Sequence, residues 1–368
     1  MNNPATPFAI SDTATAVSQA FPFLPLETYD GDFSKTPEFA PHDILFADRP
    51  IEQDPPTPDA LLDALPPVLR IQSLSRLLED DKIVNRATLC HRGSTLCVDW
   101  ITQQVDTRLH RNGLVSLRRA ATTRCKDGAT RIQRLLPVTR PMPSFNLFDT
   151  LLPGWVKDPD LALSAAALWE ALPRPLGHLV NAVLWESDRL HRFVTGPSSI
   201  AGHHNELSGN FRHSIDVAER AQELGQKSVL ANVSLLIAGG LLHDVAKAAE
   251  YRYDRRGKRF LLSDRGELIG HRDTLIEWLA VARQSGGVII DEAIWLALLH
   301  MLNAARGAPN WLGLREPRSI EAELLSMADR LSGHEDLHQR CAPKDGGNGF
   351  GSYHRHLGHR TYVTQEVH

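Results

Sequence analysis

One apolar run constrains this chain more than any other feature, because it contains two ionisable side chains. The run LLIAGGLLHDVAK covers residues 235–247 and includes His243 and Asp244. Burying an unpaired charge in an apolar helix costs several kcal/mol. A divalent ion is a sufficient partner, since imidazole nitrogens and carboxylate oxygens are ligands of ions such as Mn, Mg, Fe, Co and Ni. The run therefore predicts a buried helix that carries part of a metal site.

A lone His-Asp dipeptide has a simpler explanation, namely a helix end that meets solvent. That explanation is the better one only where further ligands are missing. If the run is helical, Lys247 lies four residues after His243 and three after Asp244, so all three share one face. Lys247 then lies within reach of an anion bound to the metal.

Further candidate ligands lie on segments with a helical pattern. His213 precedes an amphipathic segment, and His271 and His300 lie on two later ones. Asp329 follows the apolar positions of SIEAELLSMADRL, whose stripe is expected to face a core. A carboxylate beside an apolar stripe requires a cation, which extends the predicted metal site to Asp329.

At these residues the chain resembles the HD-domain metal-dependent phosphohydrolases. Within them it is most similar to the YhaM-type 3′ to 5′ exoribonucleases, which join an OB-fold to an HD domain. The resemblance covers about 180 residues in one order, which is more specific than any single short motif. The residues that carry it are His203-His204, Gly209, His213, HDVAK with Glu250 and Tyr251, GELIGH ending at His271, His300-Met301, Asn310-Trp311, EAELLSMADRL with Asp329, and GFGSYHRHLGHRTY.

The resemblance implies a metal site and a set of residues around it. The implied ligands are His213, His243, Asp244 and Asp329. The implied catalytic residues are Asp244, which orients a water as well as holding the ion, and Lys247 and His271, which contact phosphate; His271 is alternatively an additional ligand. Four further residues are candidates for supporting or substrate contacts, namely His203, His204, His300 and Arg306. The alternative is a structural role for each of these histidines. His203 and His204 would then cap the helix of His213, and His300 would be a core histidine.

The chain departs from the family pattern at one point. Where these enzymes usually have a histidine pair before a glycine, this chain has Ala305-Arg306-Gly307. Three outcomes stay open: a single catalytic metal, a second site rebuilt from His300 or His271, or lost activity.

Composition limits the class of protein. With 368 residues, 42% of them hydrophobic, the chain is long enough for two folded domains. No segment approaches the roughly 18 apolar residues of a membrane span, and the first residues lack a secretory signal pattern. The four cysteines show no CxxC spacing, which favours free thiols in a reducing cytoplasm. We expect a cytoplasmic protein that binds no membrane.

Charge divides the chain into opposing segments. Residues 1–67 contain 11 acidic and 2 basic side chains and 12 of the 23 prolines, which predicts a mostly disordered acidic leader. Residues 68–140 contain 14 basic and 6 acidic side chains. Five strand-like stretches with turn signals at Arg92-Gly93, Asn112-Gly113 and Asp127-Gly128 predict an OB-like barrel here.

This basic segment is where single-stranded RNA or DNA is expected to bind. Such barrels combine a positive groove with aromatic stacking platforms. The alternative for any single arginine is a solvated position on a β-domain. The candidates are Arg70, Arg86, Arg92, Trp100, Arg118, Arg119, Arg124 and Arg131.

The complete prediction is a multidomain protein with a small all-β OB-like barrel followed by an all-α HD-domain bundle. The expected divisions are the leader 1–67, the β-domain 68–140, a linker 141–160, the helical domain 161–335 and a tail 336–368. The favoured function is a metal-dependent 3′ to 5′ exoribonuclease on single strands. The alternatives are an HD phosphohydrolase of nucleotides or cyclic dinucleotides, and a catalytically decayed nucleic-acid-binding adaptor related to relaxases. A homo-oligomer is compatible with the sequence.

Overall fold

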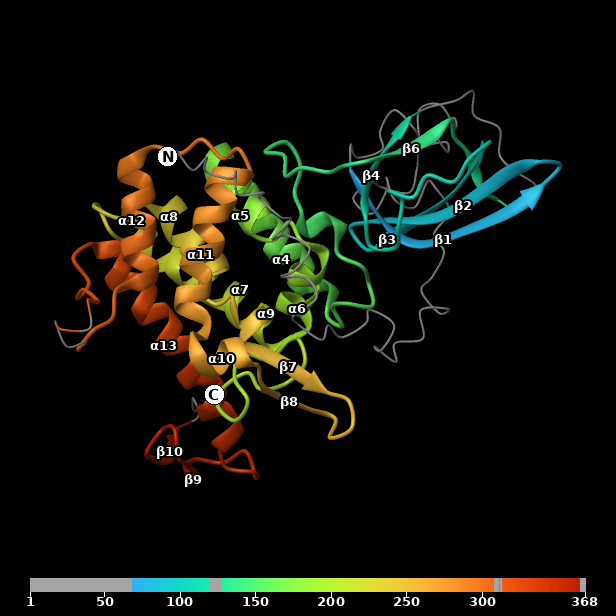
Figure 1. Cartoon of the computed structure of the whole chain (residues 1–368). Coiled ribbons are helices and arrows are strands. Elements are labelled where there is room, and N and C mark those ends of the chain that lie inside the picture. The colour runs from blue at the N-terminus through green and yellow to red at the C-terminus, as the bar shows by residue number, and fades with distance from the viewer. Residues whose placement is uncertain (1–67, 119–127, 308–310, 312, 365–368) are drawn as a thin grey trace, which may run out of the picture.

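The computed structural model describes residues 68–118, 128–307, 311 and 313–364. The predicted leader 1–67 lies outside the described residues, as do Arg119 and Arg124 of the predicted nucleic-acid set. Figure 1 shows a region of strands, drawn in blue and cyan, beside a larger region of helices, drawn in green to red. The predicted order of a small β region followed by a helical region is therefore confirmed.

The strand region is one curled sheet in the order β5-β3-β2-β1-β4-β6. The edge strands β5 and β6 are separated by only two residues, so one short segment runs along both edges and curls the sheet into a half-barrel. The sequence predicted five strands, and the fifth predicted stretch supplies both β5 and β6. The strands are β1 (Leu69–Glu79), β2 (Lys82–His91), β3 (Ser94–Thr102), β4 (Leu114–Arg118), β5 (Thr130–Arg131) and β6 (Arg134–Pro137).

Tight turns and alternating apolar residues explain the sheet. Asp80 and Asp81 join β1 to β2 with φ of 45° and 58°, and Arg92 and Gly93 join β2 to β3 with φ of 47° and 75°. Two consecutive residues with positive φ match the twist of antiparallel strands. The inward residues form a separate apolar cluster inside the half-barrel, which includes Leu69, Ile71, Leu89, Leu96, Val98, Trp100, Val115 and Leu135.

The helical region is built around one large apolar cluster. Helices α7 and α8 pack closely against each other, and α13 packs against both. The elements before the site are η3 (Phe148–Thr150), α4 (Pro159–Glu170), α5 (Arg174–Val183) and α6 (Ser187–Thr195). The remaining helices are α7 (Gly209–Gln226), α8 (Val233–Leu242), α9 (Lys247–Glu250), α10 (Asp264–Leu268), α11 (Gly270–Ser285), α12 (Glu292–Asn303) and α13 (Ile320–Cys341).

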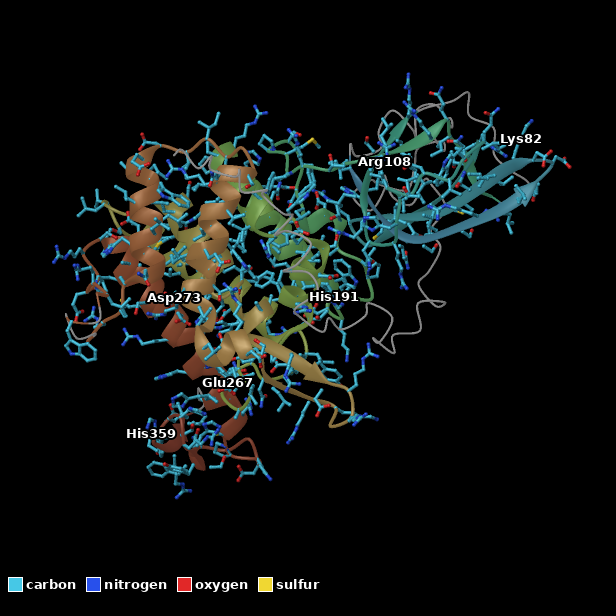
Figure 2. The ribbon with its side chains drawn as sticks, in the orientation of Figure 1. Lys82, Arg108, His191, Glu267, Asp273 and His359 are labelled. Carbon is cyan, nitrogen blue, oxygen red and sulfur yellow. The ribbon has the colours of Figure 1, made fainter. Side chains whose placement is uncertain are left out.

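Two hairpins extend from the helices. One is formed by β7 (Tyr251–Asp254) and β8 (Arg259–Leu262), and the other by β9 (Gly349–His354) and β10 (His359–Val363). Figure 2 labels His359 on the second hairpin, at the C-terminal end of α13. Among the described helices, none has the length and apolarity needed to cross a bilayer.

The two regions share a packed boundary. Val68, Cys90 and Leu114 of the strand region belong to the large apolar cluster of the helices. The segment predicted as a linker, 141–160, contributes buried residues such as Phe148 and Trp155 to the same cluster. The strands and helices are therefore joined by a common core rather than by a solvated linker.

Candidate metal centre

Three helices bring the predicted ligands together. His213 lies on α7, His243 caps the C-terminal end of α8, Asp244 follows it, and Asp329 lies on α13. Close approach of α7 and α8 depends on Gly240, because a Cβ there would lie 2.4 Å from the Cα of Ala218. The apolar run is buried as predicted, and α8 is buried from Leu235 to Leu242.

The ligand atoms of these four residues converge. His213 Nε2 lies 3.3 Å from His243 Nε2, 3.4 Å from Asp244 Oδ2 and 3.1 Å from Asp329 Oδ1. His243 Nε2 lies 3.4 Å from the same Asp244 oxygen and 3.8 Å from the same Asp329 oxygen. We call these four residues the HD centre. The donor atoms of His213, His243 and Asp244 all lie within 4.8 Å of one another, and Asp329, 116 positions after His213, adds an oxygen close to both imidazoles.

The orientation of the two imidazoles fits a metal ion. His243 Nδ1 lies 2.8 Å from the carbonyl oxygen of Gly240, which only accepts, so Nδ1 carries the proton. His213 Nδ1 lies 3.0 Å from Ser332 Oγ. In the neutral imidazole of His243 the lone pair is then on Nε2, and it points at Nε2 of His213. That nitrogen is free to bind a metal ion or to accept an N–H from His213, and second hydrogen bonds of this kind are typical of metal-ligating histidines.

Burial and nearby charges shift the pKa values of His213, Asp244 and Asp329 toward the forms that bind a metal. Burial opposes charge on Asp244, but Lys247 and the surrounding histidines hold its pKa well below the usual value. Burial also opposes charge on Asp329, where the contacts with His213 and His243 lower the pKa. Burial lowers the pKa of His213. Carboxylates and a neutral imidazole are the forms that bind divalent ions.

Lys247 and His271 flank Asp244 on either side. Lys247 Nζ lies 2.5 Å from Asp244 Oδ2 and 3.2 Å from Ser198 Oγ. His271 Nε2 lies 3.6 Å from Asp244 Oδ1, while its Nδ1 contacts the carboxylate of Glu250. These contacts place two nitrogen-bearing groups within a few ångströms of the HD centre, where a phosphate would need them.

The HD centre is open to solvent on one side. The side chain of His213 is completely buried, whereas that of Asp329 is 45% exposed. Lys247, which contacts Asp244, also lines a small pocket with Tyr251, Arg252 and Tyr253. The solvent-accessible side of the HD centre is therefore the side of Asp329 and the partly exposed His271, whereas His213 is enclosed by packing.

The other predicted histidines have different surroundings. The rings of His203 and His204 lie 5.0 and 5.3 Å from the ring of His213. His300 lies on α12, and its Nε2 accepts the backbone N–H of Arg318 in the loop before α13. Arg306 is exposed and forms an ion pair with Glu323. The structure thus brings His203 and His204 to the centre, while His300 and Arg306 are engaged in the loop that precedes α13.

Burial corrects two of the predicted nucleic-acid contacts. Arg70 is completely buried and donates hydrogen bonds to the carbonyl and hydroxyl of Thr150, the carbonyl of Asn112 and the hydroxyl of Ser187. Trp100 is 1% exposed inside the half-barrel and presents no stacking surface. Neither side chain contacts a bound strand in this fold, because each is enclosed by the packing that it stabilises.

The remaining described arginines of that set differ among themselves. Arg92 bridges the two regions through Asp149 and Glu170, and Arg86 pairs with Asp99. Arg131 is half-buried on β5, whereas Arg118 is exposed at the end of β4. The excess of basic residues in this segment is therefore used partly for structure, and Arg118 is the best placed of the described set to meet an external anion.

Two supporting residues were not assigned a role from the sequence. Ser332 contacts Nδ1 of His213, and it lies three residues after Asp329 on α13, so helical spacing would have found it. Glu250 was part of the resemblance without a role, and it contacts His271. Its position at the end of α9 depends on the chain turning at residues 243–246 between α8 and α9, which no local pattern indicated.

Comparison with known proteins agrees with this geometry. Residues 210–333 match the family model of the HD domain. All four residues of the HD centre fall within that range. No solved structure matches the chain significantly.

Several curated relatives carry one name, 3′-5′ exoribonuclease YhaM. The protein of Geobacillus sp. (strain WCH70) is 28% identical over 153 residues, which are 42% of this chain and 46% of that protein. The protein of Bacillus subtilis (strain 168) is 26% identical over 149 residues, 40% and 46% of the two chains. That of Bacillus pumilus (strain SAFR-032) is 24% identical over 205 residues, 55% and 58%. The chain spans about half the length of the curated relatives it matches, and it carries an HD domain at residues 210–333.

Proposed function

We propose that this protein is a metal-dependent phosphodiesterase that degrades single-stranded RNA from its 3′ end. The observation that carries the proposal is the pair of imidazoles whose Nε2 atoms face each other at 3.3 Å beside Asp244 and Asp329. The name shared by the relatives supplies the direction and the RNA substrate. His213, His243, Asp244 and Asp329 would hold the ion.

The residues around the HD centre suit phosphodiester hydrolysis. A bound divalent ion supplies Lewis acidity toward a phosphoryl oxygen and toward water. Asp244, whose pKa is held low, remains a carboxylate that orients a water through its second oxygen. Lys247 and His271 offset the negative charge of the phosphoryl oxygens, a contribution that is often large in phosphoryl transfer. Glu250 fixes the ring of His271 for this task.

The β region supports a nucleic-acid substrate. We infer that it is an OB-type barrel in which β5 and β6 are two parts of the fifth strand, because this segment pairs with both β3 and β4. Barrels of this type bind single strands along a positive groove. Arg118 and the exposed β6 residue Arg134 lie opposite each other on neighbouring strands and are the proposed phosphate contacts.

The test uses the full chain and RNA labelled at either end. With Mn²⁺ or Mg²⁺, RNA labelled at its 5′ end should shorten progressively, whereas RNA labelled at its 3′ end should release a labelled mononucleotide from the start. Chelator should stop both reactions. The same sequence as DNA, and free nucleotides and cyclic dinucleotides, are assayed in parallel.

The outcomes separate the candidate functions. RNA that stays intact in every metal contradicts the nuclease. Hydrolysis of nucleotides alone would favour the small-molecule phosphohydrolase, and salt-sensitive RNA binding without cleavage would favour the adaptor. Substrates blocked by a 3′-terminal duplex should resist degradation if the proposed direction is right.

A further inference from the structure

A second group of potential ligands lies beside the HD centre and outside the matched HD domain. It consists of His204, Glu206 and Asp336, and we call it the outer trio. His204 Nδ1 lies 3.8 Å from Glu206 Oε1 and 3.8 Å from Asp336 Oδ1. One donor atom from each residue lies within 4.8 Å of the other two. The trio lines a cavity of about 310 Å³.

The nitrogen at the middle of the trio has no partner. His204 is 7% exposed, and its Nδ1 is a buried atom without a hydrogen bond among the described residues. Both carboxylate oxygens are too far away for a hydrogen bond, which needs a separation of about 3 Å. Buried polar atoms in folded proteins nearly always have a partner. The unpartnered Nδ1 of His204 therefore indicates that a further group binds between the imidazole and the two carboxylates.

The separations fit a common ion better than a direct contact. Metal bonds of about 2.0–2.2 Å place two ligand atoms roughly 3 to 4 Å apart around one ion. Asp336 uses Oδ2 to accept the backbone N–H of His204, which leaves Oδ1 directed to the trio. Glu206 is half exposed and can adjust its position.

The charge of the cavity also favours a cation. Its lining includes the further acids Asp216, Glu219 and Glu335, against the two arginines Arg212 and Arg220. Arg220 is paired with both Asp216 and Glu335 at 2.8 and 2.6 Å. Within the trio, Oδ2 of Asp336 also pairs with Arg340 at 3.3 Å, which leaves its Oδ1 and the carboxylate of Glu206 to the cavity. The five acids in and around the trio still outnumber the three arginines, so the cavity retains a negative field.

One face of α13 connects the trio to the HD centre. Asp329, Ser332 and Asp336 follow the spacing of neighbours on one helical stripe. Ser332 Oγ lies 3.0 Å from His213 Nδ1 and 3.4 Å from His204 Nε2. A hydroxyl oxygen has two lone pairs, so it can accept an N–H from each ring and leave His213 Nε2 and His204 Nδ1 available to two different ions.

We propose that the outer trio is a second divalent-metal site, formed by His204, Glu206 and Asp336 and separate from the HD centre. Its ligand set of one imidazole and two carboxylates suits a transition ion such as Mn²⁺. Ser332 couples the two sites through the orientation of both histidines. The proposal does not depend on the exoribonuclease activity.

Metal stoichiometry tests the site directly. The full chain is stripped with chelator, dialysed against Mn²⁺ and analysed for bound metal. The wild type is expected to retain two ions per chain, and Glu206→Gln and Asp336→Asn one each. Glu219→Gln is the matched control, since it removes a carboxylate from the same cavity without changing the trio, and it should retain two.

The measured stoichiometries test the outer site and the HD centre separately. Two ions in Glu206→Gln and Asp336→Asn, or a wild type whose single ion is lost in Asp244→Asn, would overturn the outer site. A wild-type ion that survives Asp244→Asn and disappears in Glu206→Gln would support the outer site and contradict the HD centre. Failure of the two proposals is therefore distinguishable.

Thermal stability gives a readout that is independent of activity. In an Asp244→Asn background, added Mn²⁺ should still raise the melting temperature by on the order of a few degrees, because the ion binds only the folded state. Adding Glu206→Gln to that background should abolish the increase, and adding Glu219→Gln should preserve it. An equal increase in melting temperature with and without the Glu206 carboxylate would contradict the outer site.

Discussion

The helical and strand regions use their charged residues in opposite ways. In the helical region, His213, His243, Asp244 and Asp329 turn toward one another at a partly open centre. In the strand region, Arg70, Arg86 and Arg92 turn toward carbonyls and acids of the protein itself. The helical region leaves its ligand atoms available to an external group. The strand region uses its charged groups for contacts within the protein.

This difference shows which sequence signals carry chemical information. A His-Asp pair in an apolar run has to be explained by a partner, because burial is costly. A surplus of arginines in a β segment needs no external explanation, since each can pair with a nearby acid or carbonyl. The predictions below test whether the two regions differ in this way, beginning with the largest expected effect.

Replacing Asp244 by Asn should have the largest effect on activity. The change removes a ligand charge from the HD centre, and hydrolysis should fall by about 10³-fold with loss of the ion bound at that centre. Asp149→Asn makes the same chemical change at the boundary near Arg92 and should leave activity per folded molecule intact. Comparable losses of activity in both variants would contradict the view that the charged residues of the two regions have different roles. Initial rates with labelled RNA measure the effect.

Replacing Arg70 by Met should mainly reduce stability. The change removes the buried donor to the carbonyl and hydroxyl of Thr150, while the carbonyl of Asn112 keeps only the hydroxyl of Ser187, and the free energy of unfolding should fall by on the order of 3 kcal/mol. Urea denaturation of the full chain measures this. If stability is unchanged while RNA binding weakens, Arg70 contacts the ligand and not the protein interior.

Acid should destabilise the helical region through His191. Burial lowers the pKa of His191 to about 4, below the value of about 6.5 for an exposed histidine. The unfolded chain therefore binds more protons between these values, so stability is full above pH 6.5 and falls toward pH 4, by at most about 3 kcal/mol. His191→Gln should flatten the dependence of the unfolding free energy on pH. Parallel curves for wild type and variant would contradict this.

Replacing Arg118 by Gln should have the smallest effect. As an exposed arginine it is expected to contact one phosphate, so the salt dependence of RNA affinity should decrease by about one charge, with a modest loss of affinity. Arg92→Gln is the control, because Arg92 is paired with Asp149 and Glu170, and its slope should match the wild type. A larger change in the control would restore Arg92 as a nucleic-acid contact.

The sequence was most informative where spacing and burial act together. The helices around His213, His243 and Asp329 were predictable because apolar stripes specify their inner faces, and ligand residues lie on or beside those stripes. The strands were predictable from alternation and from turn signals such as Arg92-Gly93. Ranges of elements and the identity of candidate ligands could thus be derived locally.

Side-chain partners across the chain could not be derived in this way. Arg70 is buried because Thr150, Asn112 and Ser187 meet it from three separate segments, and no local pattern shows that meeting. The outer trio joins a loop at 204–206 to the far turn of α13, 130 residues later. Such contacts depend on tertiary packing, which composition and periodicity do not encode.

The shared boundary has a consequence for how the protein can be divided. Val68, Cys90 and Leu114 pack into the apolar cluster of the helices. Cleavage between residues 141 and 160 would therefore expose apolar surface on both fragments. Neither piece should behave as an autonomous module. A protease that cleaves this stretch should yield fragments that stay associated or precipitate, so the loss of one region should impair the folding of the other.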